Sequence, residues 1–127
     1  MNLVLVFVGG GVGAVLRYLA GAAWLRTAGP AQPYIATAVV NVVGGFLMGM
    51  LVGWLALKGA AGAERWRVLL GIGVLGGFTT FSSFSLEAVG LLQRKAYGAA
   101  AGYIGASVAL SLLALVLGLV LARRAFS

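Results

Sequence analysis

The 127-residue chain contains no cysteine and no histidine. Without cysteine it can form no disulfide framework, thiolate metal site or cysteine nucleophile, and without histidine no imidazole can act as a general acid or base. Acidic side chains are almost as scarce, since Glu64 and Glu87 are the two carboxylates of the sequence. These absences exclude most enzymatic chemistry, and we expect the chain to have no catalytic activity.

Charged residues make up 9% of the chain and hydrophobic residues 62%, whereas soluble domains carry about 25% charged residues. So few charges cannot cover a surface exposed to water, and the composition therefore predicts an integral membrane protein. The length fits one domain over residues 1–127.

The net charge of +7 is compatible with nucleic-acid binding. However, the basic residues lie mostly at the ends of apolar runs, where they would meet lipid headgroups, so we expect a lipid bilayer and no nucleic acid as partner.

Four apolar segments are long enough to cross a bilayer, which takes about 20 residues. They cover approximately residues 3–25, 34–57, 68–92 and 97–121. Both prolines, Pro30 and Pro33, lie in the first connector. The connectors are short and predict antiparallel neighbours, so the expected fold is all-α with four transmembrane helices per subunit. A cleaved signal peptide is the alternative for the first segment, but that segment contains Arg17 and has no basic residue before it.

Basic residues are distributed over both ends of this expected bundle. One end carries Lys58, Arg65, Arg67, Arg123 and Arg124, and the other carries Arg26, Arg94 and Lys95. This division is a weak bias under the positive-inside rule. We therefore hypothesise that the chain inserts in both orientations and pairs as an antiparallel, dual-topology homodimer.

A glycine-rich stretch over residues 9–14 fits the dinucleotide-binding pattern G-x-G-x-x-G/A. That motif also needs an acidic residue about 20 positions later, and the first acid of this chain is Glu64. Close helix packing is the alternative, because Gly9, Gly13 and Gly21 recur at multiples of four residues on one helix face. Small residues at this spacing let helix backbones approach each other in the membrane, and we favour packing.

Two polar side chains inside the expected spans need partners. Arg17 lies within the first span, where an unpaired guanidinium costs a few kcal/mol. A buried bond to carbonyl groups or another partner and an anion-attracting role are both open for it. Asn41 shares a helix face with Gly45 and Gly49, so this face meets another helix. Its amide either joins two helices or presents N–H donors to an anion, and the residues alone do not decide between these roles.

The segment Gly76–Ser85 (GGFTTFSSFS) places glycines, hydroxyls and phenylalanines inside the third apolar run. The glycine pair weakens the helix where the following threonines can bind freed backbone groups, so we predict that the third helix breaks over residues 76–79, near mid-membrane. Such a break exposes carbonyls that can bind a cation such as Na⁺. Phe81 and Phe84 share one face, and their ring edges, together with the hydroxyls, suit a passing anion. An aromatic core stripe with its hydroxyls bonded back to the helix is the alternative.

The fourth span places Tyr103, Ser107 and Ser111 at four-residue spacing. A row of hydroxyls on one face of a span requires a protein or water neighbour, because lipid offers no hydrogen bonds. Glu87 lies near the end of the third span. An interfacial position and a paired, buried one are both open for this carboxylate.

Three motifs, in this order along the chain, resemble the Fluc (CrcB-type) fluoride channel family. They are Gly10–Tyr18 in the first span, Thr37 with Asn41 and Gly44–Phe46 in the second, and Gly76–Ser85 followed by Glu87 in the third. The match covers essentially the whole chain, and the third motif is the specific one. Small residues replace other small residues at three positions of the family pattern, Ala36, Gly45 and Ser83.

The resemblance implies an antiparallel dual-topology homodimer with two pores. It would passively export fluoride from the cytoplasm across the plasma or inner membrane and so lower fluoride toxicity. The implied pore residues are Asn41, Phe81 and Phe84, with Ser82, Ser83, Ser85, Thr37, Tyr103 and Ser107 forming a polar track beside them. A structural Na⁺ at the dimer interface would be held by the backbone carbonyls of Gly76 and Thr79. Arg17 matches the family's first-span arginine.

A small dual-topology exporter of cationic drugs is the competing interpretation, because such proteins also have four spans. A proton-coupled exporter of this kind needs a carboxylate in its first span, where this chain has Arg17 and no acid. A membrane scaffold without transport activity is a third interpretation.

Overall fold

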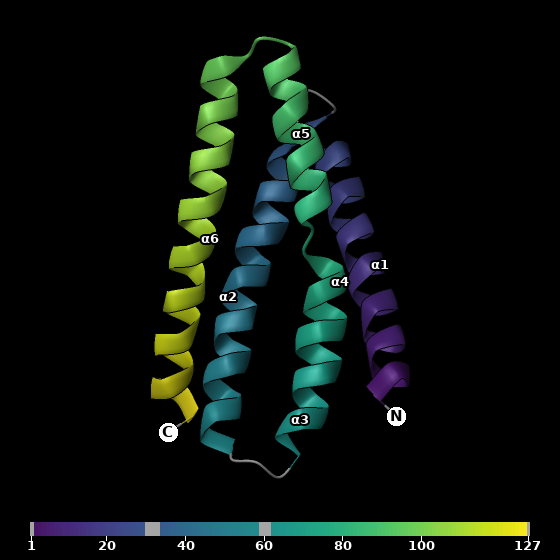
Figure 1. Cartoon of the computed structure of the whole chain (residues 1–127), viewed down its shortest axis with the longest axis vertical. Helices are drawn as coiled ribbons and strands as arrows, with labels where there is room; N and C mark the ends of the chain where they lie inside the picture. Colours follow the sequence, from purple (N-terminus) through teal and green to yellow (C-terminus); the bar gives the residue numbers. More distant parts are fainter. Residues whose placement is uncertain (1, 30–33, 59–61, 127) are drawn as a thin grey trace.

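The computed structural model describes residues 2–29, 34–58 and 62–126, and every secondary-structure element in these residues is helical. Four long apolar helical segments form an elongated bundle in which consecutive segments run antiparallel, so that the first is parallel to the third and the second to the fourth (Figure 1). The first, second and fourth are α1 (Asn2–Ala28), α2 (Tyr34–Lys58) and α6 (Tyr97–Phe126). The third is composed of α3 (Ala63–Trp66), the π-helix η1 (Arg67–Leu75), α4 (Gly76–Phe78) and α5 (Phe81–Gln93).

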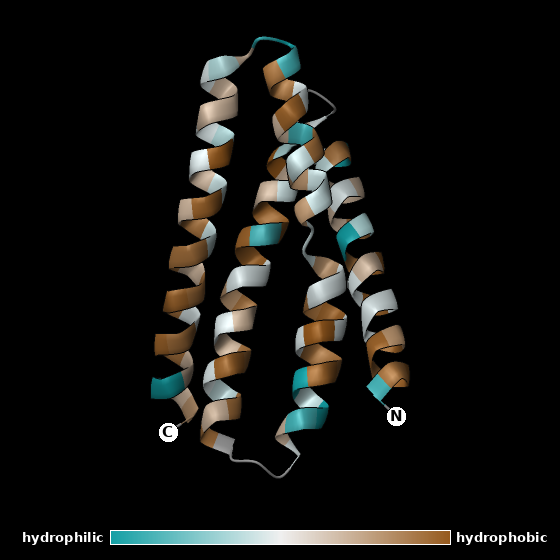
Figure 2. Cartoon of the chain, viewed as in Figure 1, coloured by the Kyte–Doolittle hydropathy of each residue, from teal (hydrophilic) through white to brown (hydrophobic). Residues whose placement is uncertain are grey.

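The all-α prediction and the four membrane spans are confirmed. The third helical segment begins at Ala63, earlier than expected, and the fourth continues to Phe126. Hydrophobic residues cover most of the bundle, and hydrophilic residues gather at its two ends and at single positions inside (Figure 2). The protein is therefore a multi-pass membrane protein. Pro30 and Pro33, expected in the first connector, lie outside the described residues.

Both ends of the described chain and the start of α3 lie at the same end of the bundle, which we call the terminal end (Figure 1). The turn between α5 and α6 and the start of α2 lie at the opposite end. This arrangement follows from four antiparallel segments joined by short connectors. It places Arg123 and Arg124 at the terminal end and Arg94 and Lys95 at the opposite end.

Glycines let α1 pack backbone to backbone against η1 and α4. A Cβ atom at Gly9 would lie 2.6 Å from the carbonyl oxygen of Leu69, and one at Gly13 would overlap the carbonyl oxygen of Val74. The packing interpretation of residues 9–14 is therefore confirmed for these two glycines. A Cβ atom at Gly21 would meet no atom within 4 Å, so this glycine does not share that role.

A second glycine-based contact joins α2 to α6. A Cβ atom at Gly45 would lie 2.9 Å from the carbonyl oxygen of Ser111, and one at Gly49 would overlap that of Leu115. Gly118 of α6 is placed in the same way against the carbonyl of Phe46. The small-residue face predicted on the second span therefore meets α6, and it holds Asn41 close to the interior of the bundle.

The third segment is broken, but the break lies later than predicted. Thr79 (φ −85°, ψ 157°) and Thr80 (φ −150°, ψ 121°) are extended, whereas Gly76 and Gly77 remain helical in α4. Threonine is β-branched and tolerates extended backbone well. Gly77 instead serves close packing, because a Cβ atom there would overlap the carbonyl oxygen of Gly10. Gly77 thus packs α4 against α1 just before the break, and the extended residues of the break are Thr79 and Thr80.

Gly13→Ala tests the contact between α1 and the third segment. The added methyl group has no space beside Val74, and overpacking of this kind costs about 1–3 kcal/mol. We expect a lower unfolding temperature in detergent. Gly11→Ala is the matched control, because its Cβ atom meets nothing within 4 Å and alanine favours helix by about 1 kcal/mol over glycine. Equal stability of the two variants would contradict the assigned packing.

Candidate functional site

Asn41 of α2 pairs with the backbone of Thr80 at the break. Its Nδ2 donates to the Thr80 carbonyl at 3.2 Å, and the Thr80 N–H donates to its Oδ1 at 3.0 Å. In a continuous helix the Thr80 N–H would donate to the carbonyl of Gly76 instead. The amide of Asn41 therefore joins two helices, which is one of the two roles left open by its position. It has two Nδ2 hydrogens, so one remains for a second acceptor.

Arg17 of α1 bonds a second carbonyl group beside the break. Its Nε donates to the carbonyl oxygen of Gly77 at 3.2 Å, a group that would accept from Phe81 in a continuous helix. The buried bond to a carbonyl, one of the alternatives for Arg17, is thus present. No carboxylate among the described residues forms an ion pair with this guanidinium, so its charge stays available to an anion.

The break also removes the helical donors of the carbonyls of Gly76 and Thr79. The Thr80 N–H is directed to Asn41 and not to Gly76, and the Ser83 N–H donates to Thr80 Oγ1 at 3.2 Å and not to the carbonyl of Thr79. Carbonyl oxygens are suitable ligands for a hard cation. Within the described ranges no group of three or more His, Cys, Asp or Glu side chains is placed to bind a metal. The carbonyl oxygens at the break, those of Gly76 and Thr79 among them, could therefore ligate a hard cation such as Na⁺.

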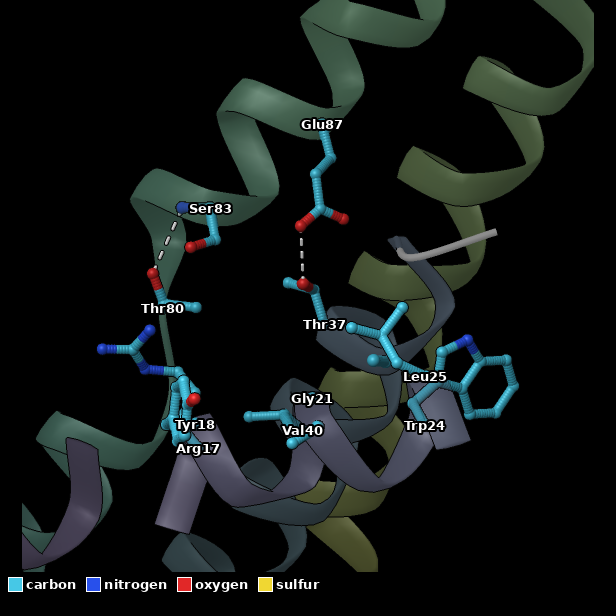
Figure 3. Close-up of a pocket in the computed structure, with 12 residues that line it drawn as sticks. Arg17, Tyr18, Gly21, Trp24, Leu25, Thr37, Val40, Thr80, Ser83 and Glu87 are labelled. Atoms are coloured by element: carbon cyan, nitrogen blue, oxygen red, sulfur yellow. Dashed lines mark hydrogen bonds between the residues drawn. The ribbon is translucent and has the colours of Figure 1, made fainter. Parts of the chain in front are cut away.

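A cleft of about 360 Å³, the arginine cleft, opens between α1, α2 and α5 (Figure 3). Its polar lining consists of Arg17, Tyr18, Trp24, Thr37, Thr80, Ser83 and Glu87. The guanidinium of Arg17 lies next to Thr80 in this view, and a dashed line marks the hydrogen bond between Thr37 and Glu87 (Figure 3). The cleft is thus lined by one guanidinium group, one carboxyl group and several hydroxyl groups inside an otherwise apolar bundle.

Glu87 connects three helices. Thr37 Oγ1 of α2 donates to Glu87 Oε1 at 2.7 Å, and the hydroxyl of Tyr103 in α6 donates to Oε2 at 3.4 Å. The sequence left the role of this carboxylate open, and the structure shows the paired alternative. A single acid inside a span was the available signal, because such a group must find hydrogen-bond donors.

A second cleft of about 250 Å³, the phenylalanine cleft, lies between α2, α5 and α6. It is lined by Asn41, Phe81, Phe84, Ser107, Val108, Ser111 and Leu112. The rings of Phe81 and Phe84 are 5.6 Å apart, and Phe84 lies 5.3 Å from the ring of Tyr103. Because Tyr103 also bonds Glu87, these side chains connect the phenylalanine cleft to the arginine cleft.

The hydroxyl of Ser107 is buried and has no hydrogen-bond partner in the described part of the chain. Its residue lines the phenylalanine cleft. A buried hydroxyl without a partner costs free energy unless water or an ion completes its hydrogen bonds. Phe81 presents the opposite situation, since 78% of this apolar side chain is exposed. The phenylalanine cleft is therefore lined by the Ser107 hydroxyl, which has no hydrogen-bond partner in the described chain, and by the Phe81 ring, which is largely exposed.

The remaining predicted site residues are distributed around these clefts. Ser82 is exposed, and its hydroxyl lies 3.1 Å from Thr80 Oγ1. Ser85 is half-buried and lines neither cleft. Thr80 and Ser111 were not among the predicted pore residues, although both line a cleft. The four-residue spacing from Ser107 was the signal for Ser111, whereas the bonds of Thr80 depend on the tertiary structure.

Curated relatives cover nearly the whole chain. A fluoride-specific ion channel FluC from Caulobacter vibrioides (strain NA1000 / CB15N) is 57% identical over 126 residues, which is 99% of this chain and 98% of the relative. Proteins of the same name from Phenylobacterium zucineum and Agrobacterium fabrum are 56% and 50% identical. They cover 98% and 99% of this chain, and the matches span 98% and 99% of the relatives.

The model of one protein family, described as CrcB-like protein, Camphor Resistance (CrcB), matches residues 4–119. This range begins in α1 and ends in α6, so it includes the break and both clefts. The predicted resemblance is therefore confirmed. The chain belongs to the CrcB-like family.

Proposed function

We propose that this chain is the subunit of a fluoride-selective channel that passively exports fluoride from the cytoplasm and so lowers its toxicity. The relatives named as fluoride-specific channels support this proposal. The observation that carries it is the polar, ring-lined route at the helix break, with Arg17 in one cleft and Ser107 and the phenylalanines in the other. Such a route has no use in a protein that only contacts lipid.

The two clefts provide the interactions that a small, strongly hydrated anion needs. Arg17 attracts the anion into the arginine cleft by its positive charge. Further inside, hydroxyl groups, the remaining N–H of Asn41 and the positive ring edges of Phe81 and Phe84 replace the lost water. None of the groups lining the phenylalanine cleft carries a full positive charge. Binding there is therefore weak enough for release, as conduction requires.

The exposure of Phe81 supports an antiparallel homodimer. This ring lines the phenylalanine cleft and yet leaves 78% of its area uncovered in the single chain. A second copy that covers the ring would close the cleft, and two-fold symmetry would then give two equivalent pores. The exposed cations Arg94 and Lys95 at one end and Arg123 and Arg124 at the other fit insertion in both orientations.

A Na⁺ ion held by the carbonyls of Gly76 and Thr79 fits this assembly. Both carbonyls lose their helical donors at the break. The ion would supply positive charge to two groups that otherwise lack a partner in the bilayer, and its role is structural. The drug-exporter alternative has no such support, because a proton-coupled exporter needs an acid in its first span and the first acid of this chain is Glu64.

Fluoride efflux from liposomes that contain the purified protein tests the proposed function. We expect rapid fluoride efflux, much slower chloride efflux, and no dependence on a proton gradient. Equal rates for the two anions would contradict the proposed selectivity. Proton movement driven by a cationic drug would favour the exporter instead.

Asn41→Asp should abolish fluoride efflux. The new carboxylate places a negative charge beside the permeating anion, and it can no longer donate to the carbonyl of Thr80. Asn2→Asp, the same chemical change on an exposed residue at the terminal end, is the control and should retain wild-type efflux. Thermal unfolding of both variants separates blocked conduction from loss of the fold. Normal efflux through folded Asn41→Asp protein would remove Asn41 from the pore.

Phe81→Ile should reduce efflux by at least tenfold, because an aliphatic side chain has no positive ring edge to direct at the anion. Phe7→Ile is the matched control. Phe7 is 83% exposed, which is close to the exposure of Phe81, but it lies on α1 and lines neither cleft. A similar efflux rate in the two variants would show that the ring of Phe81 has no part in conduction.

A further inference from the structure

We propose that the C-terminal end of α6 binds an anionic phospholipid, with Arg123 and Arg124 holding the headgroup phosphate. Both arginines lie in the last turn of α6 and are exposed. Guanidinium groups bind phosphate through paired N–H donors, which makes arginine well suited to this ligand. The site is separate from the two clefts, since neither arginine lines them.

The protein has no side-chain carboxylate left to neutralise these arginines. Its two carboxylates are Glu64 and Glu87. Glu64 forms an ion pair with Arg67 at 2.7 Å, and Glu87 accepts hydrogen bonds from Thr37 and Tyr103. The helix dipole favours cations at a helix C-terminus but supplies no full negative charge. An anion that pairs with Arg123 or Arg124 would therefore come from outside the described chain.

The packing of α6 places the arginines at the membrane boundary. A Cβ atom at Gly53 would lie 2.7 Å from the Cβ of Ala122, so the end of α6 is held against the end of α2. The neighbouring Trp54 packs its ring 6.0 Å from the ring of Trp66. Tryptophan is enriched where hydrocarbon meets headgroups. The arginines that follow Ala122 thus lie at the depth of lipid phosphates.

An apolar ridge runs from these arginines along the outside of α6. Leu113, Leu117 and Val120 are 64%, 53% and 39% exposed. Their spacing of four and three residues continues to Arg124, so all four side chains share one helix face. A free phosphate ion would use only the arginines, whereas a phospholipid would use the arginines for its headgroup and the ridge for its acyl chains. The ligand that fits both features is a phospholipid.

This ridge remains exposed in the proposed dimer. At about 100° per residue, the α6 residues that line the phenylalanine cleft (Ser107, Val108, Ser111 and Leu112) lie on average on the opposite side of α6 from the ridge. A second copy that covers the phenylalanine cleft therefore leaves the ridge in contact with lipid.

The opposite end of the bundle has a basic pair without a ridge. Arg94 and Lys95 are exposed, but α6 continues from there with small residues. A Cβ atom at Gly98 or Gly102 would meet nothing within 4 Å. The pair therefore provides the same two charges without a row of large apolar side chains on α6, and the exposed Leu86, Val89 and Leu92 of α5 lie about 80° or more around their helix from Arg94. This makes it the matched control for a lipid site at the terminal end.

The test uses the full chain in a neutral detergent, titrated with short-chain phosphatidylglycerol, short-chain phosphatidylcholine or inorganic phosphate. Binding is followed by the rise in unfolding temperature and by native mass spectrometry. We expect tighter binding of phosphatidylglycerol than of phosphatidylcholine and no binding of inorganic phosphate at matched concentration. R123Q/R124Q should weaken phosphatidylglycerol binding about thirtyfold, and Arg124→Gln alone about fivefold. R94Q/K95Q should leave it within about twofold of wild type.

Equal affinity for the two lipids, or equal weakening by R123Q/R124Q and R94Q/K95Q, would overturn the proposal. Stabilisation by inorganic phosphate equal to that by phosphatidylglycerol would also overturn it, because the ridge would then have no role. If R123Q/R124Q does not fold, Arg124→Gln and the charge-conserving R123K/R124K decide. The first should weaken binding and the second should retain most of it, and the reverse result contradicts the assignment.

Discussion

Backbone groups at a helix break cannot bond to lipid, so other parts of the protein must provide their partners. In this molecule two side chains meet part of that requirement. Asn41 replaces the helical acceptor of the Thr80 N–H and also donates to the Thr80 carbonyl, and Arg17 bonds the carbonyl of Gly77. The close approach of α1 at Gly13 and of α2 at Gly44 brings these side chains within reach. Both clefts border the break, so the candidate pore depends on this replacement of hydrogen bonds.

The scarcity of acids has consequences throughout the molecule. Glu64 and Glu87 are both bonded, the first to Arg67 and the second to two hydroxyls. Cations elsewhere, such as Arg17 and Arg124, therefore lack a side-chain counter-ion in the described chain. An anion in transit is a suitable partner for the first, and a lipid phosphate for the second. The fluoride proposal and the phospholipid proposal thus share one cause, the scarcity of carboxylates, although they concern different parts of the bundle.

Much of the fold was predictable because it depends on patterns that extend over a few helical turns. Apolar runs of sufficient length identified four spans, and glycines at four-residue spacing identified the packing faces of α1 and α2. The break in the third span was also predictable, but its position was not. Glycine was expected to interrupt the helix, yet Gly76 and Gly77 stay helical and the extended residues are Thr79 and Thr80. The contact of Gly77 with Gly10, distant in the sequence, explains this difference.

The sequence by itself determined the environment of this protein and the need for polar partners inside it. Composition indicated a membrane, and each polar residue within a span required a hydrogen bond that lipid cannot supply. Only the tertiary structure decided which partner each residue has. Asn41 bonds a residue 39 positions away, Glu87 one 50 positions away and Arg17 one 60 positions away. Helical periodicity relates residues within one segment, whereas these bonds depend on how separate segments align.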